Sequence, residues 1–172
     1  MLALFLLPLF GALSDKTNTR IGRRMPYIIG GTAAAIILMN LLPVLDNAYA
    51  ASPSPLILGL FIATLALLLV AMGVYRSPAV ALMPDVTPKP LRSRGNAVIN
   101  LMGAVGGILY LALAAVLYPA SRKVAGHVDY QPLFIIVSLI MAVSVLVLAL
   151  TVKEKRLSEE NRALEKQHPD WN

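Results

Sequence analysis

The chain of 172 residues is 58% hydrophobic and 14% charged, and its mean hydropathy is +0.72. Ordinary soluble domains do not have this composition, which is that of a protein embedded in lipid. The net charge of +6 is carried by loops and a tail without any nucleic-acid-binding motif, so we expect membrane lipid as a partner and no nucleic acid. The absence of cysteine excludes disulfides, thiolate metal ligands and cysteine nucleophiles.

The chain opens on an apolar stretch over residues 1–13. As a helix this stretch reaches only about 20 Å, and it has neither a basic start nor a separate cleavage site, which argues against a signal peptide. We expect it to be the C-terminal part of a transmembrane helix whose upstream part lies outside this chain.

Four longer apolar segments can each span a bilayer core of about 30 Å. They cover residues 26–45, 56–83, 97–118 and 133–152. The second segment would be about 42 Å long as a straight helix, so we expect it to tilt, to kink at Pro78 or to protrude. The sequence thus predicts an all-α membrane protein with four complete spans and a half span, the four spans forming one bundle over residues 14–152.

The positions of Lys and Arg indicate the orientation, because these residues accumulate in short loops that face the cytoplasm. With loop 14–25 placed inside, loop 84–96 and the tail 153–172 also lie inside, and only Arg122 and Lys123 fall on the outer side. This pattern predicts a multi-pass protein of the plasma or inner membrane whose two basic loops and tail are cytoplasmic.

The tail 153–172 mixes acidic and basic residues. Leu157 and Leu164 lie seven residues apart, which fits a short surface helix, but the composition also fits a solvated linker. A lone histidine near the end, His168, does not make a metal site.

Two motifs carry a family resemblance. Residues 11–26 read GALSDKTNTRIGRRMP and resemble the signature between the second and third helices of major facilitator transporters. The long form of this motif looks like that of the glycoside-pentoside-hexuronide cation symporters and the related sucrose-type carriers. Residues 75–97 read YRSPAVALMPDVTPKPLRSRGNA and are similar to the region from the fourth to the fifth helix of the sucrose-type branch.

The resemblance implies a partial N-terminal six-helix bundle of a major facilitator fold, running from helix two to helix six and into the linker between halves. The parent would have twelve helices, and its missing C-terminal half would be a partner of this chain. Such carriers hold substrate at mid-membrane between two bundles that rock against each other. The resemblance therefore implies secondary active transport of a sugar or glycoside by alternating access.

The charged residues of the first motif are candidates for a cytoplasmic gate. In the family, the aspartate that matches Asp15 helps to latch the cytoplasmic side to the opposite half when the carrier faces outward. The alternative is that these charges only shape a tight loop and obey the positive-inside rule. Gly22 would supply a backbone angle that a side chain resists. The candidate residues of this loop are Asp15, Lys16, Arg20, Gly22, Arg23 and Arg24.

Three residues of the second motif, Arg76, Asp85 and Arg92, complete the candidate gate. Arg76 interrupts a spanning segment, where an unpaired arginine costs roughly 2.5–3.5 kcal/mol on insertion scales. It would therefore snorkel toward the inner leaflet, pair with Asp15 or Asp85, or contact a sugar hydroxyl. Asp85 is the expected partner.

Polar residues inside the spans are candidates for substrate binding, and they are Asn40, Arg76 and Asn100. An asparagine in such a place also bonds across helices, which is the competing interpretation of Asn40 and Asn100. Gly103 and Gly107 form a small-xxx-small pair, which predicts the close approach of another helix.

Departures from the related carriers bear on the coupling ion. Ala3 and Leu7 stand where sodium-coupled melibiose carriers have acidic residues, and Arg76 stands where those carriers have a sugar-binding aspartate. A sodium site is therefore not expected, and the proton becomes the expected coupling ion. The four spans hold no Asp, Glu or His, so the coupling residue would lie outside this chain.

Enzyme chemistry is not expected. The sequence has no HExxH motif, no phosphate-binding loop and no nucleophile–base pair within the membrane, and His127 lies in an outer loop. Neither a cofactor nor a metal is expected. The competing functional hypothesis is a small helical membrane scaffold that binds partners through its glycine face and charged tail.

Overall fold

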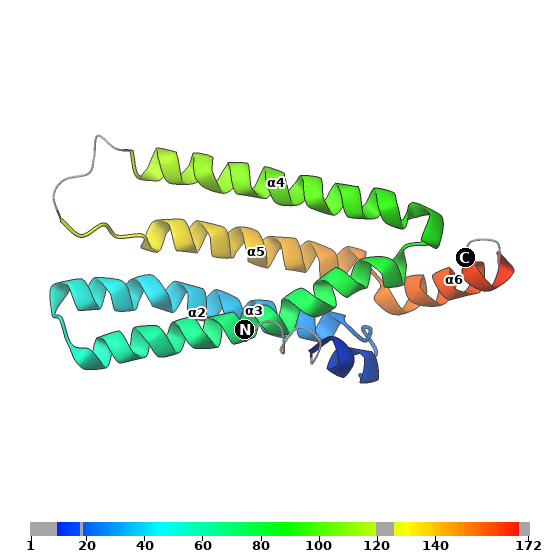
Figure 1. Cartoon of the computed structure of the whole chain (residues 1–172), viewed down its shortest axis with the longest axis horizontal. Helices are drawn as coiled ribbons and strands as arrows, with labels where there is room; N and C mark the ends of the chain where they lie inside the picture. The colour runs from blue at the N-terminus through cyan, green and yellow to red at the C-terminus, as the bar shows by residue number, and fades with distance from the viewer. Residues whose placement is uncertain (1–9, 18, 120–125, 169–172) are drawn as a thin grey trace.

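The computed structural model describes residues 10–17, 19–119 and 126–168. These residues form helices and, apart from one isolated bridge between Thr19 and Gly22, no β-structure. Residues 10–16 are helical. The helices that follow are α2 (Met25–Ala51), α3 (Pro55–Val86), the 3-10 helix η1 (Lys89–Leu91), α4 (Arg92–Leu117), α5 (Gln131–Thr151) and α6 (Glu154–Gln167) (Figure 1).

Four of these helices, α2 to α5, are long and apolar enough to cross a membrane. Their long axes run roughly along one direction, and they cover the four segments expected to span (Figure 1). The chain is therefore an all-α membrane protein, as the sequence predicted. Of the expected half span 1–13, residues 10–13 are helical and residues 1–9 lie outside the described residues.

Helices α2 and α3 form a tightly packed hairpin. Ser54 starts α3, because its hydroxyl accepts a hydrogen bond from the Leu56 N–H (3.3 Å) and Pro55 follows at the first helical turn. The helices approach so closely at Gly31 that a Cβ there would lie 2.8 Å from Tyr75 Cβ. The core of the hairpin consists of Ala35, Leu42, Leu68 and Ala71.

Helix α5 packs on the other side of α2. Val145, Leu148 and Val152 lie against a second buried cluster formed by Met25, Ile28 and Leu82. Nearer the middle of the span, the Asn40 side chain of α2 donates to Ser138 Oγ of α5 (2.6 Å). Helices α2, α3 and α5 therefore share the second cluster, which lies near the end where α6 begins.

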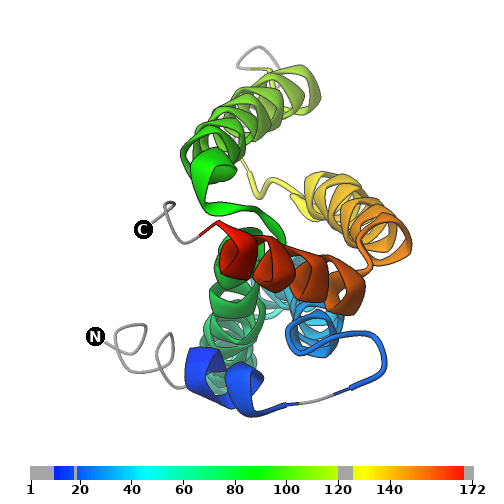
Figure 2. The same cartoon turned by 90° about the vertical axis from the view of Figure 1, so that its right-hand side faces the viewer.

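Helix α4 is different, since none of its residues is buried. It runs roughly along the direction of α5 but is set apart from the other three spanning helices (Figures 1 and 2). A Cβ at Gly103 or Gly107 would meet no heavy atom within 4 Å, so the glycine pair faces open space in the described part of the chain.

The expected loop 84–96 is largely helical instead. Helix α3 continues to Val86 through Pro78 and Pro84, and α4 starts at Arg92. Its 32 residues give α3 a length of about 48 Å, more than a bilayer core. Side-chain donors from other elements satisfy the carbonyls at its end.

The tail also forms a helix. Helix α6 lies across the end of the bundle where α2 begins and α3 ends (Figure 2). The face that it buries carries Glu154, Ser158 and Asn161, whereas Leu164 is 38% exposed. Of the two interpretations of the tail, the structure thus shows the short surface helix, and this helix is attached through polar residues.

Candidate functional site

The candidate gating residues gather at one end of the bundle, which we call the basic end. It comprises the end of helix 10–16, the loop before α2, the η1 segment and α6 (Figures 1 and 2). Backbone and side-chain contacts tie these elements together, and each contact is described below.

A tight turn shapes the loop before α2. The Gly22 N–H donates to the Thr19 carbonyl (3.3 Å), and the Thr19 hydroxyl donates to the Gly22 carbonyl. Gly22 has a φ of 129°, which a side chain rarely adopts. A Cβ at this position would also overlap the carboxylate of Glu154. Glycine is thus required both by the backbone angle and by the close approach of α6.

Glu154 caps the start of α2. Its carboxylate accepts hydrogen bonds from the backbone N–H groups of Arg23 (2.8 Å), Arg24 (3.1 Å) and Met25 (3.0 Å). The residue is only 2% exposed. The first N–H groups of a helix have no partner within the helix and attract negative charge, so a carboxylate suits this place. The N-cap residue of α2, Arg24, makes no such bond with its own side chain.

The side chain of Arg24 lies at the centre of an ion-pair network. Its guanidinium contacts Asp85 through Nε (2.6 Å) and Asp15 through Nη2 (3.0 Å). Arg23 also reaches Asp85 (3.2 Å). The Arg24 side chain is 8% exposed, and a charge so deeply buried needs a carboxylate partner to offset its lost hydration. The network links helix 10–16, the loop and α3.

The end of α3 is capped from two sides. Arg92 donates to the carbonyls of Pro84 (2.9 Å) and Thr87 (3.2 Å), and Asn161 of α6 donates to those of Asp85 (3.2 Å) and Thr87 (3.3 Å). These bonds satisfy carbonyls that a helix end leaves without partners.

Arg92 binds α6 as well, through an ion pair with Glu165 (2.7 Å). Helix α6 therefore caps the start of α2 with Glu154 and the end of α3 with Asn161. Glu154, Ser158, Asn161 and Glu165 recur at intervals of three and four residues, the spacing of one helix face. This polar spacing is the signal in the sequence for the docking of α6, and it leaves no trace in the hydrophobic periodicity.

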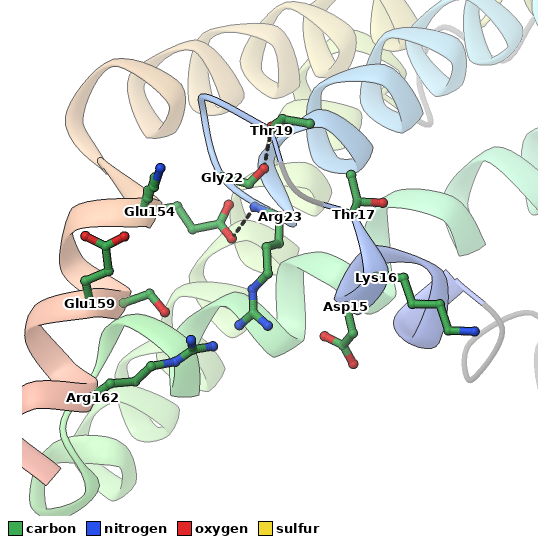
Figure 3. A pocket seen from close by; sticks show the side chains of 11 residues that line it. Asp15, Lys16, Thr17, Thr19, Gly22, Arg23, Glu154, Glu159 and Arg162 are labelled. Carbon is green, nitrogen blue, oxygen red and sulfur yellow. Dashed lines mark hydrogen bonds between the residues drawn. The ribbon is translucent and has the colours of Figure 1, made fainter. Parts of the chain in front are cut away.

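An open pocket of about 500 Å³ lies between the loop and α6. Figure 3 shows Glu154 reaching from α6 to the Arg23 backbone at one side of this pocket, with Asp15 and Lys16 opposite. Both signs of charge line it, with Lys16, Arg23 and Arg162 facing Asp15 and Glu159.

Three of the predicted charged residues form no ion pair among the described residues. Lys16 is exposed at the end of helix 10–16, Arg20 is exposed in the loop, and Arg76 is exposed on α3. Within the described ranges Arg76 makes no hydrogen bond or ion pair, so its expected pairing with Asp85 is not formed. Asp85 lies nine positions further along the helix, about 13 Å away by helical rise, and is already paired with Arg23 and Arg24.

The two candidate asparagines differ in their surroundings. Asn40 donates to the Ile36 carbonyl (2.8 Å) and to Ser138, so its amide is used in joining α2 to α5. Asn100 is exposed on α4. The structure thus favours the helix-bonding interpretation for Asn40 and leaves Asn100 accessible.

At the opposite end of the bundle, Asp129 ties the segment before α5 to α2. Its carboxylate accepts from the Asn47 amide (2.8 Å) and from the Gln131 N–H (2.9 Å). The bond from Asn47, with that from Gln131, lowers the pKa of Asp129 below its ordinary value. His127 lies beside it and contacts Asn47 (2.6 Å).

No group of three or more His, Asp or Glu residues that could hold a metal ion occurs in the part of the chain that the structure describes. At the basic end, two carboxylates bind one arginine side chain, and a third carboxylate caps the start of α2. Together with four apolar helices, these features define a multi-pass membrane protein with a charged network at one end.

The family model of the Major Facilitator Superfamily matches residues 1–172. The chain therefore belongs to the major facilitator superfamily, and its function lies in membrane transport. Among curated proteins no match is found, and no solved structure matches either. The network and the α6 caps thus belong to a transporter.

Proposed function

We propose that the chain is the N-terminal part of a sugar or glycoside carrier that works by alternating access, with a proton as the coupling ion. The basic end would face the cytoplasm of a cell bounded by a plasma or inner membrane. The two motifs support the branch, because they resemble the glycoside-pentoside-hexuronide and sucrose-type carriers. A transporter family also agrees with the expectation that the chain is not an enzyme.

The observation that carries the gating proposal is the different exposure of the partners around Arg24. Its side chain is 8% exposed and that of Asp85 is 21% exposed, whereas that of Asp15 is 54% exposed. Asp15 can therefore bind an approaching donor from another part of the carrier while Asp85 keeps the buried arginine neutralised. A latch of this kind forms and breaks without leaving a buried charge unpaired.

Substrate contacts are proposed for Arg76 of α3 and Asn100 of α4. Both are exposed in this chain, and both lie in helices that span the membrane. Asn40 is a weaker candidate, because its amide already binds Ser138. The proton site would lie outside this chain, since the predicted spans hold no acidic residue and no histidine.

Uptake of labelled sugars and glycosides into cells that make the full polypeptide from its own gene tests the proposal. An antibody against residues 153–172 gives the mass of that polypeptide and its amount in the membrane. We expect Asp15→Asn to reduce uptake severely at an unchanged membrane level, because the neutral amide loses the charge of the latch. Glu159→Gln changes an exposed carboxylate of the same pocket and should leave uptake unchanged.

Two results would contradict the proposal. Normal uptake by the Asp15→Asn protein would remove Asp15 from the gate. Uptake that persists after a protonophore has collapsed the proton gradient would exclude proton coupling.

A further inference from the structure

A groove of about 410 Å³ opens at the basic end, on the side of the bundle where α2 and α5 meet. It lies between the loop before α2, the end of α5 and the start of α6. Its lining residues are Arg20, Ile21, Met25, Ile29, Ala149, Val152, Lys153, Lys155, Arg156 and Glu159. The groove therefore combines an apolar floor with a charged rim.

The rim is basic, and one of its arginines, Arg156, also forms an exposed ion pair with Glu160 on its own helix (2.7 Å). Arg20 comes from the loop, and Lys153, Lys155 and Arg156 come from the start of α6, with Glu159 as the one acidic residue of the lining. The four basic residues are exposed and come from chain segments far apart in the sequence. Such an arrangement complements a phosphate group, which arginine and lysine bind through charge-assisted hydrogen bonds.

A second groove continues the first into the span. It is about 260 Å³ in volume, lies between α2 and α5, and shares Ile29 and Ala149 with the charged groove. Its other lining residues are Thr32, Ala33, Ile36, Ala142, Val145 and Leu146. Only one of the eight, Thr32, is polar, and its buried hydroxyl has no hydrogen-bond partner among the described residues.

We infer that the two grooves together form a binding site for one anionic phospholipid. The phosphate would bind Arg20, Lys153 and Arg156 at the rim, and an acyl chain would lie between α2 and α5. This inference rests on the membrane insertion of the four helices and is independent of which substrate the protein carries.

The apolar continuation distinguishes a lipid from free phosphate. An inorganic anion would use only the rim, and it would gain nothing from an apolar slot within the hydrocarbon region. A zwitterionic lipid would fill the slot equally well, but it brings a positive group to a rim that already carries four basic residues. The combination therefore favours a lipid with a net negative headgroup.

Lipid binding to the full polypeptide in a mild detergent tests the inference. The probe is phosphatidylglycerol, and phosphatidylcholine with the same acyl chains is the comparison, with affinities from native mass spectrometry. Each basic residue near an anionic surface contributes a factor of about five, so Lys153→Gln with Arg156→Gln should weaken phosphatidylglycerol binding about 30-fold. Arg94→Gln with Lys166→Gln removes two charges of the same end outside the groove and should leave the affinity unchanged.

A second pair of variants tests the apolar groove. Ala149→Phe fills the shared part of both grooves and should displace the lipid. Leu150→Phe enlarges the neighbouring side chain, which is 72% exposed, and should have no effect.

Equal affinity for phosphatidylcholine would overturn the inference, as would equal losses in the variants and their controls. Displacement of phosphatidylglycerol by millimolar inorganic phosphate would reduce the site to an anion site and would also overturn it. None of these results bears on sugar uptake, so failure here is distinguishable from failure of the proposed function.

Discussion

Removing the carboxylate of Glu154 should open the start of α2. The variant Glu154→Ala leaves the backbone N–H groups of Arg23, Arg24 and Met25 without their acceptor. Loss of a cap costs about 1 kcal/mol, and each unsatisfied buried donor costs about 1–3 kcal/mol. The adjoining open pocket lets water reach part of this site, so we expect each donor to cost near the lower end of that range. The total cost of removing the carboxylate is then about 3 kcal/mol.

Amide hydrogen exchange of residues 21–25 measures this opening directly, in the protein held in lipid nanodiscs. A cost of about 3 kcal/mol raises the exchange rate of these amides about 100-fold, while amides in the middle of α2 keep their protection. Glu154→Gln retains one neutral acceptor, and since neutral hydrogen bonds are about half as strong, the increase should be about 10-fold.

Glu159→Ala is the matched control, because Glu159 lies on the same helix but is exposed. It should leave the exchange of residues 21–25 unchanged. If Glu154→Ala also leaves these amides protected, the carboxylate does not hold the start of α2, and the reasoning about α6 is wrong.

Three further changes address single contacts. Gly22→Ala forces a side chain onto a φ of 129° and into Glu154, so thermal unfolding should show a loss of about 2 kcal/mol or more. The double variant of Gly22→Ala and Glu154→Ala should lose less stability than the two single variants added together, because both break the same contact. Asn40→Leu removes the hydrogen bond to Ser138. A double-mutant cycle with Ser138→Ala should give a coupling free energy of about 0.6 kcal/mol between the two residues. Because the pKa of Asp129 is lowered, its hydrogen bonds stabilise the segment before α5 above the ordinary pKa of 3.8, and this contribution is lost as the pH falls through the lower pKa of the folded state. The Gln131 amide resonance should therefore titrate with a midpoint below 3.8, and Asp129→Asn should abolish this titration.

Each of these expectations has a clear contrary result. Full additivity of the Gly22 and Glu154 variants would mean that the two residues do not interact. A coupling near zero between Asn40 and Ser138 would remove their bond as a link between α2 and α5. A Gln131 titration with its midpoint above 3.8 would contradict the direction of the Asp129 shift.

The four spans were predictable because each depends on a local property, an uncharged apolar run long enough for a bilayer. The cluster of Asp15 and Arg24 was predictable for a similar reason, since both stand in one short motif. The ion pair between Arg24 and Asp85 was not predictable, because the sequence offered Arg76 as the partner of Asp85. Arg76 is excluded because α3 continues as a helix and separates the two residues along its axis. Polar residues near a helix end have several potential partners, and packing selects among them.

The role of α6 was the largest omission. Hydrophobic periodicity normally indicates the docking face of a helix, and in the tail it offers only Leu157 and Leu164. Here the docking face carries Glu154, Ser158 and Asn161, because it meets backbone N–H and C=O groups at helix ends and not an apolar core. A helix that caps other helices needs polar residues on its buried face. By amphipathicity alone, such a polar face is predicted to be exposed to solvent.

The cap on α2 also dictates an order of events during biosynthesis. Glu154 lies 131 residues after Arg23, so the start of α2 cannot be completed until α5 has been made and α6 has emerged from the ribosome. At about 5–20 residues per second this interval lasts roughly 7–26 s. Throughout that time the loop motif is already exposed at the membrane surface with its three amides unpaired. Closure of the basic end is therefore a late step, because it needs a helix that follows all four spans in the sequence.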